Sequence, residues 1–397
     1  MKKKYLFVFC AAIMPKLMIA QPSQQQRIKD SVIGWWSVLP KKATTPDNNN
    51  GYTFTVAQQE NLNEIIRWMY KTYTPVAGLG TFKKNFDADL GAQKRYPPHY
   101  YGVEFRIWDV SFDKQWLTPE GKFRPIDEQY TSFYILINAI PENKPVIFVN
   151  NSDRYVFTML PDGSGGEQLK EQRKDSDPNI HSNVYPYLKY KSNYQNIYLA
   201  PGNKLPIATV SKGELLNMAE SSIETLLKTE LEKVKQQFSN SKAQQDAYAY
   251  RKKDIEKYRT EIQKLRNKHI NSLDQPAVVN NPEITIYSFS ANTDPFEISE
   301  NQREWKQYYT VHQYTKDLLT KCRTDKPQWI VISFPFITKD RGNQLTEMYK
   351  AITENFNYEY VFNYFFNPEK VKGIIYKPAD EEGLKKRLNS YNRTKQK

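Results

Sequence analysis

Residues 211–271 contain apolar side chains at steps of three and four, and this pattern constrains the fold more than any other feature of the chain. The region opens with Ser211-Lys-Gly-Glu214, in which the serine and glutamate side chains can bond the free amides at the start of a helix. The polar stretch Ser239–Asp246 divides it into two parts. Two narrow apolar stripes with polar backs predict a helical hairpin whose seam is like that of a short coiled coil. A single long helix broken near Ser239 is the alternative.

The hairpin also predicts a partner. The apolar positions of its two stripes are Leu216, Ala219, Ile223, Leu226, Leu227, Leu231, Val234 and Phe238, then Ile255, Tyr258, Ile262 and Leu265. Because two helices alone leave part of such a stripe uncovered, a third surface is needed to bury it. We therefore expect a protein partner to bind through the 211–271 helices.

The residues before the hairpin predict a helix followed by antiparallel strands. Val56–Tyr73 has apolar side chains on one helical face, and Pro75 ends it. Tyr101–Ile107 alternates apolar and polar residues as a half-buried strand does. The alternation changes parity near Trp108, which predicts a β-bulge. Further apolar runs, joined by short turns as far as Leu160, predict an antiparallel meander.

The residues after the hairpin predict alternating strands and helices. Gln275–Pro282 has the composition of a linker. The expected strands are Ile284–Phe289, Trp329–Phe334, Glu359–Phe365 and Gly373–Lys377, and the expected helices are Asn301–Cys322 and Gln344–Phe356. Elements of this length in this order are typical of a small α/β unit.

The predicted fold class is therefore α+β, with an N-terminal helix plus antiparallel β-meander, a central helical hairpin and a small C-terminal α/β unit. A chain of 397 residues has room for two domains after an export signal. The expected boundaries are a signal peptide at 1–20, a flexible lead-in at 21–50, an α+β domain at 51–210, the helical hairpin at 211–274 and the α/β unit with a basic tail at 275–397. Within the lead-in, the apolar segment Ser31–Leu39 is expected to pack on the body.

The first twenty residues have the three parts of a secretory signal peptide. Lys2–Lys4 form the charged start, Tyr5–Met14 is an uncharged apolar core too short to span a membrane, and Ala20 is a small residue at the end. We therefore expect an exported protein of the periplasm or the exterior, able to associate with the cell envelope, with no transmembrane segment after signal removal. Cys322 is the only cysteine beyond the signal, so no disulfide can form within the mature chain.

The positive charge has a plain interpretation in an exported protein. The formal net charge is +13, and Lys2, Lys3, Lys4 and Lys16 belong to the expected signal. The other positive residues are scattered, without the spacing of helix-turn-helix, RNP or zinc-finger proteins. We interpret the charge as a solvated basic surface with weak attraction for anionic envelope polymers, and we expect no nucleic-acid partner.

The sequence carries no recognisable catalytic or metal-binding motif. The four histidines, His99, His181, His269 and His312, lack zinc-like spacing from one another and from cysteine, so neither a metal nor a cofactor is expected. Asp162-Gly-Ser-Gly-Gly166 is close to a nucleophile elbow, but no apolar helix follows it, which favours a solvent loop. We expect a non-enzymatic binding or interaction protein.

The candidate ligand-binding residues surround the strand predicted at 101–107. They are His99, Tyr101, Glu104, Arg106, Trp108 and Trp116. Flat aromatic faces beside polar groups can stack on sugar rings, so the alternative function is a carbohydrate-active enzyme or a glycan-binding module with an aromatic groove in the N-terminal domain. The competing interpretation is that these aromatic residues form the core of that domain.

One further pattern agrees with export. The segment Ala200-Pro-Gly-Asn-Lys-Leu-Pro-Ile-Ala-Thr209 precedes a capped helix, and the expected signal ends at Ala20-Gln21. The combination resembles exported proteins of unknown function from Bacteroidota-type bacteria. This resemblance covers only a small part of the chain and implies no site or activity.

Overall fold

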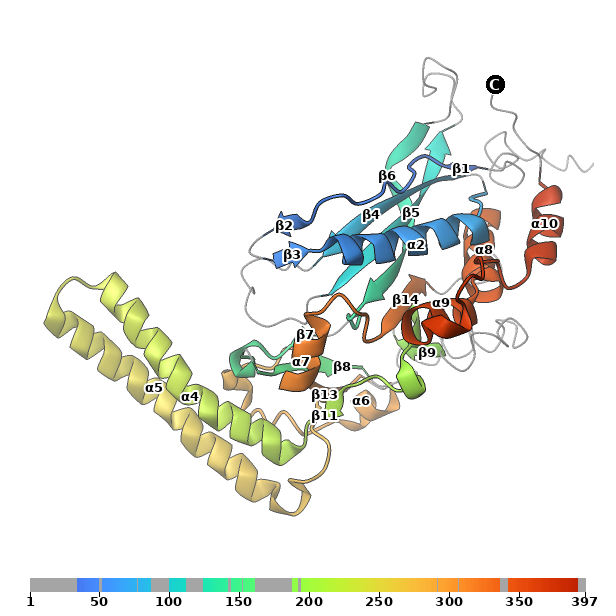
Figure 1. Ribbon diagram of the computed structural model, residues 1–397. Coiled ribbons are helices and arrows are strands. Elements are labelled where there is room, and N and C mark those ends of the chain that lie inside the picture. The colour runs from blue at the N-terminus through green and yellow to red at the C-terminus, as the bar shows by residue number, and fades with distance from the viewer. Residues whose placement is uncertain are drawn as a thin grey trace, which may run out of the picture.

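The computed structural model of the protein describes residues 34–49, 52–76, 78–86, 100–111, 124–141, 144–151, 153–160, 188–191, 194–290, 292–305, 307–335 and 342–391. The expected signal peptide, the Asp162–Gly166 loop and the last residues of the basic tail lie outside these ranges. Helices and mostly antiparallel strands are mixed along the described chain, which confirms the predicted α+β class (Figure 1).

The larger of two main sheets has the strand order β1-β4-β5-β6-β14-β10-β9. Its strands are β1 (Trp35–Trp36), β4 (Gly78–Phe86), β5 (Tyr101–Ser111), β6 (Arg124–Ile137), β9 (Leu188–Lys191), β10 (Tyr194–Leu199) and β14 (Ile330–Pro335). Neighbouring strands are antiparallel except β1 and β4. The strands β4, β5 and β6 form a meander, and a register shift between Trp108 and Val110 confirms the predicted bulge.

This sheet draws strands from both ends of the chain. β14 lies between β6 and β10, with Ile332 opposite Ile135 on one side and Ile197 on the other. Residues 51–210 and 275–397 therefore contribute to the same sheet, although the sequence assigns them to different domains.

Helices cover one face of the larger sheet and form the main core with it. α2 (Val56–Thr72) begins at a capping box formed by Thr55 and Gln58, which confirms the predicted helix. α8 (Asn343–Lys350), a π-helical turn at Ala351–Asn355 and α9 (Tyr358–Phe366) belong to the same apolar cluster (Figure 1). Inside this cluster, Phe105 of β5 stacks on Phe133 of β6 with ring centroids 4.8 Å apart.

The smaller sheet has the strand order β11-β13-β8-β7, and β12 also pairs with β13. Its antiparallel strands are β7 (Lys144–Pro145), β8 (Tyr155–Met159), β11 (Ala208–Thr209), β12 (Val278–Val279) and β13 (Tyr309–Tyr314). Its side chains pack against Tyr198 and Val331 of the larger sheet and against α7 (Lys316–Cys322). Cys322 is buried in this cluster, and burial raises the pKa of its thiol to about 12, which disfavours the reactive thiolate.

The part of the lead-in that the structure describes is attached to the body, whereas the sequence predicts flexibility at 21–50. β2 (Asp47–Asn49) pairs with β3 (Tyr52–Phe54). Trp36 stacks on Tyr70 at 4.4 Å between ring centroids, and its Nε1 donates to the carbonyl oxygen of Tyr73 at 2.9 Å. The tryptophan therefore packs on the body, as expected of the apolar segment at 31–39.

The predicted helical hairpin is present. α4 (Lys212–Gln237) starts at the Ser211–Glu214 capping box, and α5 (Ser241–Lys268) starts at Asn240, whose side chain accepts from the first amides of that helix. Because the chain reverses at residues 238–240, the alternative of one broken helix is wrong. At about 1.5 Å per residue α5 is about 42 Å long. The half of the hairpin near its base packs on the smaller sheet and forms a second apolar core beneath it, with Ile223 of α4 in the same cluster as Val156 of β8 and Val311 of β13. The tip of the hairpin projects beyond this core (Figure 1). We call this hairpin, residues 212–268, the arm.

Two C-terminal elements differ from the sequence prediction. The stretch 301–322, expected to be one helix, contains part of α6 (Glu300–Glu304), then β13 and α7. β13 lies between β8 and β11, so sheet pairing overrides the helical pattern there. The stretch 359–365, expected to be a strand, lies in α9 because Tyr360 and Tyr364 at helical spacing both pack edge-on against Trp68. Packing overrides the strand preference of these aromatic residues.

Two other expected strands are turns in the structure. Within 284–289 the chain forms a 3₁₀ turn at Ile286–Ser288, where the hydroxyl of Ser288 accepts the backbone N–H of Thr285. Such local bonds compete with strand pairing. Within 373–377, Gly373 has a φ of 75° and turns the chain out of an extended path.

Candidate functional site

The structure separates the candidate residues of β5 onto two faces of the larger sheet. Tyr101 points into the main core at 1% exposure, and its hydroxyl accepts from Nδ2 of Asn61 at 3.1 Å. Glu104, Arg106 and Trp108 lie on the opposite face, because successive strand residues alternate. The two remaining candidates, His99 and Trp116, lie outside the described residues.

Glu104 is held as a charged, fully bonded carboxylate. It accepts from Nη2 of Arg106 at 2.7 Å and from the hydroxyl of Ser132 at 2.8 Å. Burial alone would raise the pKa of Glu104, but these two bonds, with Lys83 nearby, hold it below its ordinary value. A general acid must carry a proton near neutral pH, so this environment does not suit Glu104 for that role.

The aromatic side chains near Glu104 are engaged with one another. Trp108 packs on Tyr130 with ring centroids 4.6 Å apart, and its Nε1 donates to the hydroxyl of Thr81 at 2.7 Å. The guanidinium of Arg106 lies 4.8 Å from the centre of the Tyr130 ring, a cation–π contact. Tyr130 is the residue that sequence reasoning missed, and only the pairing of β5 with β6 brings it opposite Trp108. Glycan binding at this cluster stays a prediction.

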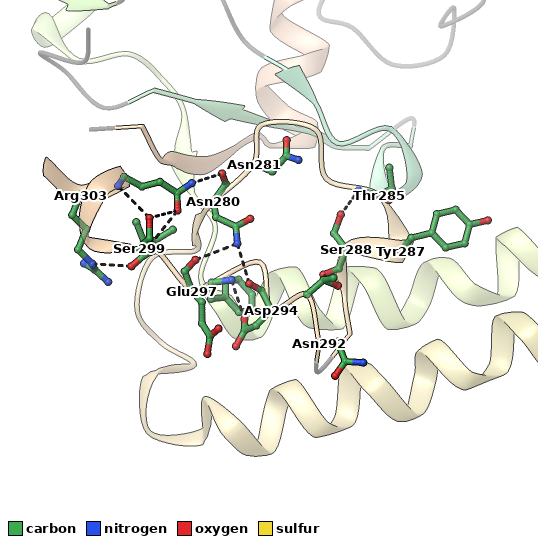
Figure 2. A pocket seen from close by; sticks show the side chains of 14 residues that line it. Asn280, Asn281, Thr285, Tyr287, Ser288, Asn292, Asp294, Glu297, Ser299 and Arg303 are labelled. Carbon is green, nitrogen blue, oxygen red and sulfur yellow. Dashed lines mark hydrogen bonds between the residues drawn. The ribbon is translucent and has the colours of Figure 1, made fainter. Parts of the chain in front are cut away.

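A pocket of about 940 Å³ lies in the segment that follows the arm (Figure 2). Most of its lining side chains, from residues 280–303, carry amide, hydroxyl or charged groups, and Phe296 and Ile298 add apolar surface. Asn280 holds its wall by donating from Nδ2 to the carbonyl oxygens of Asp294 and Glu297, both at 3.1 Å. Gln302 of α6 donates to the carbonyl oxygen of Asn280 at 2.9 Å. The pocket is therefore shaped by the loop's own hydrogen bonds.

The buried carboxylate in the pocket wall connects it to the end of the arm. Asp294, with a side chain 1% exposed, accepts from Nζ of Lys268 at 2.9 Å and lies 2.7 Å from Nε2 of His269. It also accepts the backbone N–H of Phe296 at 2.9 Å. Burial alone would raise the pKa of Asp294, but the bonds from Lys268, His269 and Phe296 hold it below its ordinary value. Asp294 therefore serves as a structural anion.

The two helices of the arm meet along heptad seams. The seam residues alternate at steps of four and three, and they are Ile223, Leu227, Glu230, Val234 and Gln237 on α4 and Gln244, Tyr248, Arg251, Ile255, Tyr258, Ile262 and Leu265 on α5. Near the tip the seam becomes polar, since Arg251 bonds Glu230 and Gln237, both at 2.7 Å. A polar layer of this kind fixes the register of two helices at a cost in stability.

The arm has two unlike sides. Glu224 directly follows the seam residue Ile223 on α4, and Arg259 directly follows the seam residue Tyr258 on α5. Because these two side chains pair at 2.9 Å, the residues that directly follow seam positions on the two helices lie on the same side of the arm. The other side faces the body, since Leu226 packs against the core beneath the arm and Lys268 pairs with Asp294. The first side is therefore turned away from the body.

We call the distal part of this side the outer face. It consists of Lys228, Leu231, Lys235, Phe238, Lys242 and Lys252. The four lysines are exposed, Phe238 is 37% exposed and Leu231 is half-buried. Lys235 pairs with Glu232, whereas the other three lysines have no acidic partner in the described part of the chain. On the side facing the body, by contrast, Lys257 pairs with Asp254 and Lys264 pairs with Glu261.

Three other observations bear on function. In the described ranges no helix is long and apolar enough to cross a membrane. No group of three or more histidine, cysteine or acidic side chains in those ranges is arranged to hold a metal ion. Comparison of the chain with protein-family models, with curated proteins and with solved structures finds no match.

Proposed function

We propose that this chain is a non-enzymatic, exported interaction protein of the cell envelope, and that its arm binds a partner protein. The observation that carries the proposal is the outer face. Beyond Leu227 on α4, the arm buries little except its own seam, where Val234 is the last buried residue of that helix. The distal part of the arm, which does not pack on the body, is suited to reaching another molecule.

The chemistry of the outer face favours an acidic partner. On α4, Lys228 and Lys235 lie seven residues apart, and the apolar pair Leu231 and Phe238 has the same spacing, while Lys242 and Lys252 are added from α5. This repeat can pack beside a third helix as in a helix-in-groove contact, provided that the partner supplies acidic side chains around an apolar strip. Export itself is proposed from the N-terminal pattern of a charged start, a short apolar core and a small exit residue.

We expect the double variant Lys235→Glu with Lys252→Glu to lose partner binding at least tenfold, because like charges would then face each other across the contact. The measurement is chemical crosslinking of the purified mature protein to envelope extracts of its host. It is followed by identification of the crosslinked protein and titration of that purified protein against each variant.

The matched control is Lys257→Glu with Lys264→Glu, which changes the charge of the arm equally on the opposite side. Partner binding should survive in this control. A chain in which residues 228–254 are replaced by a short turn tests the arm as a whole. If both double variants and the shortened arm all retain the same partner at the same affinity, the proposed function is wrong.

A further inference from the structure

The pocket at 280–303 supports a second inference, which is independent of the arm's outer face. We infer that this pocket binds a neutral saccharide. Its volume of about 940 Å³ is at the upper end of the usual size of ligand pockets and can hold several sugar rings. Some polar groups of this loop bond one another, and others are left to bond a ligand.

Contacts within the protein hold the pocket wall in shape. Asp294 is fixed to the end of the arm by Lys268 and His269, while Asn280 and Gln302 brace the loop through three hydrogen bonds of 2.9–3.1 Å. Phe296, at 6% exposure, anchors the same segment in the core beneath the arm. A cavity whose walls are already bonded loses little conformational entropy when a ligand enters.

The groups left for a ligand lie around the rim. Figure 2 shows Arg303 and Tyr287 at opposite ends of the pocket, with Asn281 and Asn292 between them. Within the described part of the chain, Nδ2 of Asn281, the amide of Asn292, both Nη atoms of Arg303 and the hydroxyl of Tyr287 make no hydrogen bond. These donors and acceptors match the hydroxyl groups of a sugar, each of which both donates and accepts.

The charges of the lining favour a neutral ligand. Lys268 already pairs with both carboxylates, Asp294 at 2.9 Å and Glu297 at 2.5 Å, and Arg303 is the one cation of the lining. A phosphate or sulfate group would meet two carboxylates beside one guanidinium, and an apolar ligand would leave the amides unpaired. A ligand with many neutral hydroxyl groups avoids both costs.

Tyr287 supplies the flat surface that sugar rings favour. It is 59% exposed, and its ring is held by an edge-on contact with Tyr258 of α5 at 5.3 Å between centroids. The contact restrains one edge of the ring while most of its surface stays exposed. An apolar ring with a polar tip can contact the C–H face of a sugar and bond one of its hydroxyls at once.

The test is a titration of the full mature protein by isothermal calorimetry with three neutral trisaccharides: chitotriose, cellotriose and maltotriose. A glycan array with neutral and sulfated members runs beside it. We expect at least one of these neutral glycans to bind with a dissociation constant of about 1 mM or tighter. Tyr287→Ala should weaken that binding about tenfold, and Asn292→Ala about fivefold. Tyr287→Phe should retain most of the affinity, since it keeps the ring.

The matched control is Tyr250→Ala, which removes a tyrosine that is 77% exposed on the arm. It should leave the affinity unchanged. The inference is overturned if no neutral glycan binds, or if Tyr287→Ala and Asn292→Ala bind as well as the wild type. Binding of sulfated glycans alone, lost in the Lys235→Glu with Lys252→Glu variant, also overturns it, because the arm's charge would then explain the binding.

Discussion

An Ile332→Ala variant is expected to lose about 2–5 kcal/mol of unfolding free energy and still to unfold in a single transition. Ile332 is fully buried at the centre of the larger sheet, opposite Ile135 of β6 and Ile197 of β10. The cavity left by the truncation would open between strands that come from distant parts of the chain. The main core extends from these strands to α2. The substitution should therefore destabilise both the segment before the hairpin and the segment after it in the sequence.

Chemical denaturation followed by tryptophan fluorescence and by far-ultraviolet circular dichroism measures this effect. Both signals should shift to the same lower midpoint. The matched control is Ile375→Ala, at a position 72% exposed in the same C-terminal stretch, and it should change the stability by no more than about 0.5 kcal/mol. Two separate transitions, of which the substitution moves only one, would instead mean that residues 275–397 fold as an independent unit.

The features that the sequence predicts correctly are local ones. The Ser211–Glu214 capping box and the steps of three and four that follow it lie within one helix, so their spacing alone defines α4. The bulge near Trp108 is likewise visible as a change in the parity of alternating residues. These patterns need no knowledge of what packs against them.

The features that the sequence does not predict depend on distant contacts. The aromatic stretch of α9 favours a strand by composition, and only its packing on Trp68 makes it helical. No local sequence pattern indicates that β14 pairs between β6 and β10.

The candidate site follows the same rule. Alternation along β5 places Glu104, Arg106 and Trp108 on one face, as the strand pattern implies, but their contact Tyr130 is set by the register with β6. In the 280–303 pocket, the buried carboxylate of Asp294 is matched by two cationic or polar groups at the end of α5. A lone Asp-Pro pair in a polar stretch gives no such signal, since Lys268 and His269 are 25 or more residues away in the sequence.

The pocket and the base of the arm should both depend on Asp294, and an Asp294→Asn variant is expected to lose about 2–3 kcal/mol of unfolding free energy at neutral pH. The carboxylate accepts from Lys268, His269 and the N–H of Phe296, and its side chain is 1% exposed. An amide of the same size has one acceptor oxygen and turns an NH₂ group toward one of these donors. Glu297→Gln is the matched control: Glu297 also pairs with Lys268 but is 65% exposed, so its loss should cost no more than about 1 kcal/mol.

The effect of Asp294 should also vary with pH in a defined direction. Because the pKa of Asp294 in the folded protein lies below its ordinary value of 3.8, its stabilising contribution is complete above that value and is lost as pH falls through the folded pKa. The asparagine variant has no such carboxylate, so the stability gap between the wild type and the variant should narrow as pH is lowered from 5 toward 2. Denaturation midpoints measured at steps across this range give the gap directly. A gap that stays constant or widens on acidification would show that the Asp294 carboxylate is not the ionised anchor of the pocket wall.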